Sequence, residues 1–180
     1  MKPFPRIASQ GPVTADDRAS AIDFVNRVNW FFETWDVESM LASFQPDAVA
    51  FHFHGTIRGK EEMRHFFDHD YPYLIPGVSR NATNHIVDQD GDGVVVRYQN
   101  LLIRHALPED ALKVGAGEVM ESQDDLPAIW LYSPMLDRLR RTPGGEWKIF
   151  ERYIGGSTTN ARLTPGHTDA TYFSRYMPRV

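Results

Sequence analysis

The sequence of 180 residues contains no cysteine. Disulfide bonds, thiol nucleophiles and cysteine-ligated zinc or iron–sulfur centres are therefore excluded. No apolar run approaches the roughly 20 residues that a membrane-spanning helix needs. Basic residues are scarce relative to acidic ones, since 19 Lys and Arg against 24 Asp and Glu give a formal charge of −5. Nucleic acids and anionic membranes bind to basic faces, so we expect neither as a partner.

The first residues, Met1 to Arg6, lack the apolar stretch of a secretory signal, and we expect a cytoplasmic protein. The length fits a single domain. Aromatic residues are plentiful, with 4 Trp, 7 Tyr and 11 Phe making up 12% of the chain. This ring surface can build a large core and can also line a pocket.

Hydrophobic periodicity predicts the order helix, helix, strand, helix and then four strands. Thr14 is a good N-cap for a long helix that ends near Trp35, and Asp36 can cap a short helix over residues 37–44. Further along the chain we predict a strand over residues 48–54, a turn between Gly55 and Gly59, a helix over 60–71, and strands over 79–88, 94–105, 129–141 and 147–154. The sequence Asp-Gly-Asp-Gly at 90–93 is typical of a tight hairpin.

Helices that precede an antiparallel meander predict an α+β fold. A strongly curved mixed or antiparallel sheet wrapped around the long N-terminal helix would form a cone-shaped barrel with a pocket inside. We expect three parts: an irregular lead-in over residues 1–13, the cone domain over 14–157, and a polar tail over 158–180. The aromatic residues of the tail suggest that it covers the pocket or an interface.

Four stretches together resemble a known family. They are Phe31-Phe32-Glu33-Thr34-Trp35-Asp36, then Phe44-Gln45-Pro46-Asp47-Ala48-Val49 with Phe66-Phe67, then Thr83-Asn84-His85-Ile86-Val87-Asp88, and Leu136-Asp137-Arg138-Leu139 with Trp147-Lys148-Ile149. In order and spacing, over roughly residues 16–157, they resemble the SnoaL-like branch of the nuclear transport factor 2-like superfamily. The resemblance implies an α+β cone with a deep pocket, in a homo-oligomer such as a dimer or trimer.

Members of this family include polyketide cyclases, dehydratases, dehydrochlorinases, isomerases and non-enzymatic modules. Dehydratase-like members use a His–Asp pair as general base, and the matching positions here hold Arg80 and Glu33. That pair is therefore not reproduced, and proton transfer would pass to other residues. The chain is also similar to cofactor-independent bacterial lyases that release formaldehyde from lignin-derived diaryl dimers (diarylpropanes or phenylcoumarans).

Candidate catalytic residues come from three predicted strands. His52 and His54 share one face of the first strand, where two imidazoles can act as acid and base near neutral pH. In the strand over 94–105, Tyr98, Asn100 and Arg104 share a face: Tyr98 can donate a proton, Asn100 can hold a hydroxyl, and Arg104 can stabilise developing oxyanion charge. His85 is a further proton-transfer candidate.

Candidate substrate-binding residues are aromatic or polar. Trp130 and Tyr132 can stack on an aromatic substrate, and Trp30 can line part of the pocket. Glu33 offers a carboxylate at the mouth. The other candidates on the strand over 79–88 are Arg80 and Asn84, and simple alternation places Asn84 with Arg80 and Ala82 on the face opposite His85.

Together with these residues, the resemblance implies a cofactor-independent lyase acting on a small hydrophobic aromatic alcohol, by acid–base elimination or retro-aldol-like cleavage. A dehydratase, isomerase or polyketide cyclase on the same scaffold is an alternative, as is a binding module or a dioxygenase small subunit without chemistry of its own. His65 and His69 have the i,i+4 spacing of metal ligands, but flanking acids indicate a solvated helix face, and we predict no metal. Asp137 and Arg152 are expected to form a structural pair.

Overall fold

The computed structural model describes residues 4, 11–52, 55–70, 77–107, 110, 117–121 and 125–163. The helices are α1 (Ala15–Thr34), α2 (Val37–Ala42), α3 (Gly59–His65), the π-helix η1 (Phe66–Asp70) and the 3-10 turn η2 (Ala161–Leu163). The strands are β1 (Phe44–His52), β2 (Gly55–Arg58), β3 (Val78–Asp90), β4 (Gly93–Arg104), β5 (Ala128–Arg141), β6 (Trp147–Ile154) and β7 (Thr158–Thr159). None of these helices is long and apolar enough to cross a membrane.

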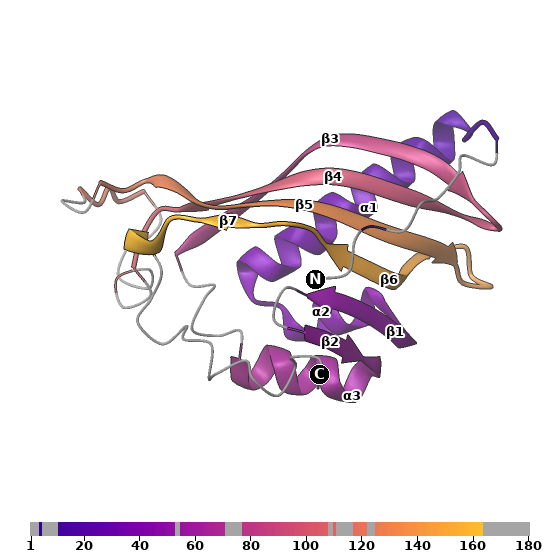
Figure 1. The fold of residues 1–180 in the computed structure, drawn as a ribbon, viewed down its shortest axis with the longest axis horizontal. Helices are drawn as coiled ribbons and strands as arrows, with labels where there is room; N and C mark the ends of the chain where they lie inside the picture. Colours follow the sequence, from indigo (N-terminus) through magenta and orange to yellow (C-terminus); the bar gives the residue numbers. More distant parts are fainter. Residues whose placement is uncertain are drawn as a thin grey trace.

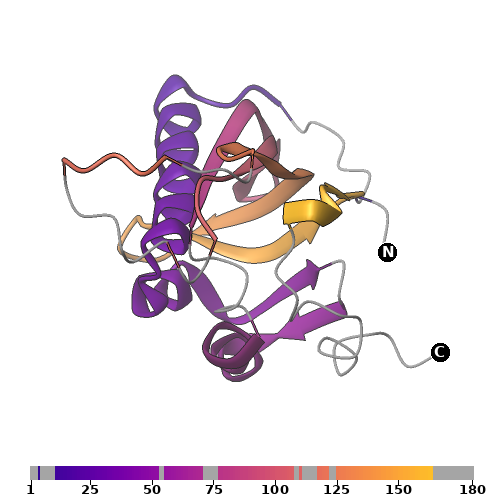
Figure 2. The ribbon, with the colours of Figure 1, turned by 90° about the vertical axis from the view of Figure 1, so that its left-hand side faces the viewer.

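The strands form one curved sheet in the order β2-β1-β6-β5-β4-β3, with β7 beside β5. The β1–β6 pair is parallel and the others are antiparallel, so the sheet is mixed. Helix α1 lies along the sheet, and β1, β2 and α3 lie near the C-terminal end of α1 (Figures 1 and 2). The predicted α+β fold with a curved sheet around a long helix is confirmed, although the strands of the described part do not close into a barrel.

The long helix α1 follows the predicted signals closely. Thr14 is its N-cap, and the Thr14 Oγ1 accepts a hydrogen bond of 3.0 Å from the backbone N–H of Asp17. Its end at Trp35 has a left-handed backbone, with φ of 59°. One stripe of the helix, including Val25, Val28 and Phe32, is buried against the sheet. Burial of this stripe, more than helix propensity, stabilises the element.

Three boundaries differ from the sequence predictions. Helix α2 stops at Ala42, so Phe44 already belongs to β1, and a shift in register against β6 accommodates the following residues, Pro46 among them. The segment Gly55–Arg58 is not a turn but a strand that pairs antiparallel with β1. A four-residue strand is too short to show a clear alternation. The predicted helix over 60–71 is split into α3 and the π-helix η1, and Tyr71 lies outside the described residues.

The hairpin between β3 and β4 forms where predicted, with Asp90 paired to Gly93. The register shifts between Thr83 and Ile86, and Asn84 has a left-handed φ of 55°. This bulge adds one residue and reverses the alternation of faces. The prediction that Asn84 shares a face with Arg80 was therefore wrong: Asn84 is exposed, and His85 takes the inward position, stacked on Tyr98.

Candidate functional site

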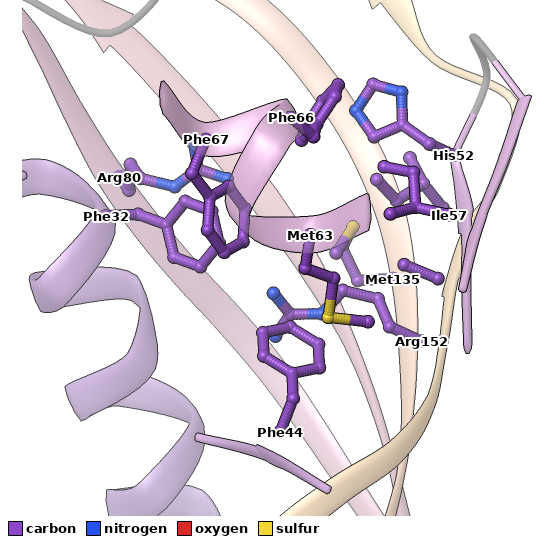
Figure 3. Close-up of a pocket in the computed structure, with 12 residues that line it drawn as sticks. Phe32, Phe44, His52, Ile57, Met63, Phe66, Phe67, Arg80, Met135 and Arg152 are labelled. Carbon is purple, nitrogen blue, oxygen red and sulfur yellow. The ribbon is translucent and has the colours of Figure 1, made fainter. Parts of the chain in front are cut away.

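A cavity lies between the C-terminal part of α1, the β1–β2 hairpin, α3 with η1, and the inner face of the sheet (Figure 3). Its volume is about 30 Å³, which is room for about two water molecules. Most of the wall is aromatic or aliphatic, and three polar side chains reach it: His52, Arg80 and Arg152. The apolar lining residues are Phe32, Phe44, Ala50, Ile57, Met63, Phe66, Phe67, Met135 and Ile154.

Arg152 is held in place by a buried carboxylate. Its Nε and Nη2 donate to the two oxygens of Asp137 at 2.7 and 2.8 Å, and Tyr98 donates its hydroxyl to the same carboxylate at 3.0 Å. The Arg152 guanidinium lies 5.2 Å from the ring centre of Phe44 (Figure 3). Burial raises the pKa of Tyr98 well above its ordinary value, and the nearby Asp137 charge adds to this. Tyr98 therefore stays protonated and orients Asp137.

Arg80 enters the cavity from the start of β3. Its Nε donates to Asn29 Oδ1 at 3.5 Å, and its guanidinium lies 5.0 Å from the ring centre of Phe32. Glu33 does not reach the cavity, because its carboxylate accepts hydrogen bonds from the backbone N–H of Arg80 and from the Ser79 hydroxyl. Glu33 thus fixes the end of α1 to β3.

His52 is the last residue of β1 and stands at the opposite wall, beside Ile57 (Figure 3). Its ring meets the Phe66 ring edge-on, with 5.4 Å between the centres. The face shared by Ala48, Ala50 and His52 points inward, since both alanines are buried and His52 lines the cavity. His54 lies outside the described residues.

His85 and Asn100 lie on the inner face of the sheet but do not line the cavity. Asn100 is 1% exposed and donates its Nδ2 to Asn29 Oδ1 at 3.2 Å. The Asn100 Oδ1 and the His85 Nε2 are both shielded from solvent and have no hydrogen-bond partner. Burial lowers the pKa of His85 below its ordinary value, so its neutral form is favoured.

The remaining predicted residues lie elsewhere. Arg104 is fully buried, 4.4 Å from the ring centre of Trp130, and donates to the backbone oxygen of Ala106; neither Arg104 nor Trp130 is part of the cavity wall. Tyr132 pairs with Leu101 on the outer face of the sheet. Trp30 is 60% exposed. The predicted placement of these side chains in the pocket was wrong. Arg104 faces inward but lies at the end of β4, against Trp130. The register shift after Leu102 puts Trp130 and Tyr132 on different faces, and Trp30 lies on the exposed side of α1.

Sequence analysis missed Arg152, which it assigned to a structural pair. Both descriptions hold, because the ion pair with Asp137 is what aims Arg152 at the cavity. It also missed the aromatic wall from the paired Phe66 and Phe67, although that pair stood out in the sequence. Among the described residues, no group of three or more His, Asp or Glu is placed to hold a metal ion. His65 and His69 lie on an exposed surface with their ring centres 4.5 Å apart and their planes tilted by 49°.

Comparison with known proteins identifies the fold family. The family model of the SnoaL-like domain matches residues 13–153. The chain belongs to the SnoaL-like family. SnoaL-like domains often host cofactor-free isomerase, cyclase or lyase activities. No curated protein matches the chain.

Solved structures with this architecture are similar to the SnoaL-like chain at low sequence identity. One is a protein of unknown function with a cystatin-like fold from Nostoc punctiforme, with 22% identity, a TM-score of 0.63, and coverage of 80% of this chain and 93% of that one. Another is an NTF2-like protein from Novosphingobium aromaticivorans, with 17% identity, a TM-score of 0.59 and 88% coverage of both chains. ActVI-ORFA from Streptomyces coelicolor has 15% identity, a TM-score of 0.58, and coverage of 76% and 94%. These likenesses support the fold.

Proposed function

We propose that this SnoaL-like protein is a cofactor-independent lyase acting on a small aromatic alcohol or ketone by proton transfer. One observation carries the proposal: two guanidinium groups and one imidazole, from β3, β6 and β1, reach a single cavity with aromatic walls. Arginine stays cationic at all working pH values, so Arg80 and Arg152 can stabilise a developing oxyanion. His52 is the only lining residue among those described that can both take and give a proton near neutral pH.

A retro-aldol-like cleavage fits these groups. In a β-hydroxy aryl ketone, His52 removes the hydroxyl proton, the carbinol carbon becomes a carbonyl, and its bond to the carbon next to the ketone breaks. The electron pair of that bond moves onto the ketone to form an enolate. The enolate oxygen lies against Arg80 or Arg152, and the proton returns to the enolate carbon. A hydroxymethyl substituent would leave as formaldehyde. A dehydration or double-bond shift would use the same base and the same oxyanion site.

The cavity volume of about 30 Å³ is smaller than an aromatic ring needs. A ring can enter only if part of the wall moves, and the wall over the cavity carries Met63, Phe66 and Phe67 from α3 and η1. π-helical turns are uncommon and are frequent at functional sites. A single-ring substrate requires a smaller displacement of this wall than a diaryl dimer does. The small volume also favours a second candidate, a SnoaL-like module without chemistry that binds a partner, as a dioxygenase small subunit does.

The first test detects proton abstraction whatever bond breaks later. Purified protein with EDTA and no added cofactor is incubated in D₂O with aryl ketones, β-hydroxy aryl ketones and lignin-derived diaryl dimers. Deuterium incorporation is followed by NMR, and formaldehyde and products by mass spectrometry. We expect exchange or turnover that His52→Gln lowers by about 10²–10⁴-fold, while the matched surface variant His65→Gln keeps the full rate. Folded protein that neither exchanges nor converts any compound favours the binding module.

A further inference from the structure

Two buried polar atoms on the inner face of the sheet lack hydrogen-bond partners. They are Nε2 of His85 on β3 and Oδ1 of Asn100 on β4, and both are shielded from solvent. The two residues lie close in register, because Ala82 is opposite Asn100 and the bulge at residues 84–85 is opposite Tyr98. Buried polar atoms in native proteins are nearly always hydrogen-bonded, so two exceptions on residues close in register point to an occupant.

The orientation of the Asn100 amide follows from its neighbour. Asn29 donates its Nδ2 to the backbone oxygen of Val25 at 2.9 Å, which fixes Asn29 Oδ1 as an acceptor. Asn100 must therefore present its Nδ2 to Asn29, and its Oδ1 faces the other way. The free Oδ1 accepts only, so the missing partner has to be a hydrogen-bond donor.

The position of His85 results from the bulge. Its ring stacks on Tyr98, with 5.6 Å between the centres and 21° between the planes. The Tyr98 hydroxyl donates to Asp137, so its hydrogen is not available to His85 or Asn100. A neutral imidazole nitrogen is a donor in one tautomer and an acceptor in the other. A hydroxyl group, which donates once and accepts twice, can satisfy both Asn100 Oδ1 and His85 Nε2.

The two residues are connected to the cavity through Arg80. The Arg80 guanidinium lines the cavity and donates to Asn29 Oδ1, the same oxygen that accepts from Asn100. We propose that His85 and Asn100 form an inner polar subsite, next to Arg80, that binds a hydroxyl group of the ligand in the cavity. The subsite deepens the proposed function and rests on it, since it specifies an alcohol with its ring against the aromatic wall. An ordered water molecule could make the same hydrogen bonds to Asn100 Oδ1 and His85 Nε2 as the ligand hydroxyl.

The test uses two matched probes, benzyl alcohol and ethylbenzene, which differ only by hydroxyl in place of methyl. Protein labelled with ¹⁵N-histidine and with ¹³C-methyl methionine is titrated with each probe. We expect both probes to shift the methyl resonances of Met63 and Met135, because both residues line the cavity. Only benzyl alcohol should shift Nε2 of His85. In Asn100→Leu the preference for the alcohol should fall by about 3–10-fold, the contribution of one hydrogen bond.

His85→Phe separates a functional role from a structural one. Phenylalanine keeps a ring on Tyr98 and removes the unpartnered nitrogen, so we expect an unchanged or higher Tm together with loss of the alcohol preference. A lower Tm would mean that the imidazole already has a stabilising partner, and would overturn the proposal. The exposed His65→Phe serves as control for the added ring and should leave the preference unchanged.

The outcomes also separate this proposal from the proposed function. If both probes shift the methionines and neither shifts His85, the subsite holds water only and this inference falls, while turnover on the substrate panel still decides the lyase. If neither probe enters the cavity, the subsite falls, because no ring-bearing alcohol can reach it. If the alcohol shifts His85 but no panel compound reacts, the subsite stands as a binding feature of a non-catalytic module.

Discussion

Replacing Asp137 by asparagine tests whether the buried ion pair aims Arg152. The Asp137 side chain is fully buried and accepts three hydrogen bonds, two from Arg152 and one from Tyr98. The Arg152 side chain is 7% exposed, so water cannot take over the role of the carboxylate. The Asp137→Asn substitution would keep the shape of the side chain but remove its negative charge, and the new amide nitrogen would face a donor.

The size of the effect follows from the charge that is left behind. Removing one partner of a buried ion pair costs about 3–5 kcal/mol, because the other charge stays buried without compensation. Against a typical total of about 5–15 kcal/mol, this is at least about a fifth of the stability of the domain. Arg152→Met in the same chain removes the stranded charge. We therefore expect Asp137→Asn/Arg152→Met to be no less stable than Asp137→Asn alone.

Urea unfolding followed by tryptophan fluorescence measures these differences. The matched control is Asp88→Asn, which breaks the ion pair with Arg97 on strands β3 and β4, where both side chains are about 30% exposed. Exposed pairs contribute about 0–1 kcal/mol, so this variant should lose little. If Asp137→Asn loses no more than Asp88→Asn, then Arg152 is held by packing alone, and the argument that the carboxylate aims it is wrong.

Three further predictions concern separate parts of the fold. Burial lowers the pKa of His85 in the folded protein, so the unfolded chain takes up a proton at His85 more readily. The free energy of unfolding is therefore unaffected by His85 above the ordinary value of 6.5 and falls as pH falls through 6.5 toward the lower folded pKa. Chemical unfolding at pH 7 and pH 5 should show a smaller loss for His85→Phe than for wild type, and equal losses would contradict the sign. Gly93→Ala should lower the free energy of unfolding by more than about 2 kcal/mol, because its Cβ would lie 2.0 Å from the Leu139 backbone oxygen. Gly91→Asn, at φ of 62° with its nearest contact at 3.5 Å, should leave the free energy of unfolding nearly unchanged in the same urea titration. Thr14→Ala should lower the free energy of unfolding by about 1 kcal/mol through loss of the N-cap, and a change near zero would mean that α1 is anchored by packing alone.

The sequence predicted the elements whose signals are local and strong. Helix α1 has an N-cap and a long apolar stripe, and the hairpin at residues 90–93 has its glycines, so both formed where expected. Strand β2 was missed because four residues cannot establish a period. The parallel pairing of β1 with β6 joins residues about a hundred positions apart, and no local pattern encodes it.

The site was predicted less well, because one residue decides which way a strand side chain points. The bulge at Asn84 moved His85 inward, and the register shift after Leu102 separated Trp130 from Tyr132. Alternation assumes an unbroken strand, so it fails for the candidates at the bulges of β3 and β5. Arg104, on the regularly alternating strand β4, kept the face of Tyr98 and Asn100. Arg80 lies before the bulge of β3, and His52 lies in the regular part of β1 that follows its register shift. Both side chains line the cavity.

The presence of arginine at position 80 has a consequence for the chemistry. The family pattern puts a histidine there with an acid on α1, and this chain has Arg80 and Glu33 instead. Glu33 binds the β3 backbone, and Arg80 cannot act as a base, so the pair serves to hold a cation in place. In the proposed reaction His52, which lines the same cavity as Arg80, would move the proton, while His85 lies on the inner face of the sheet outside the cavity. In that proposal Arg80 supplies a fixed positive charge beside the base rather than a base itself.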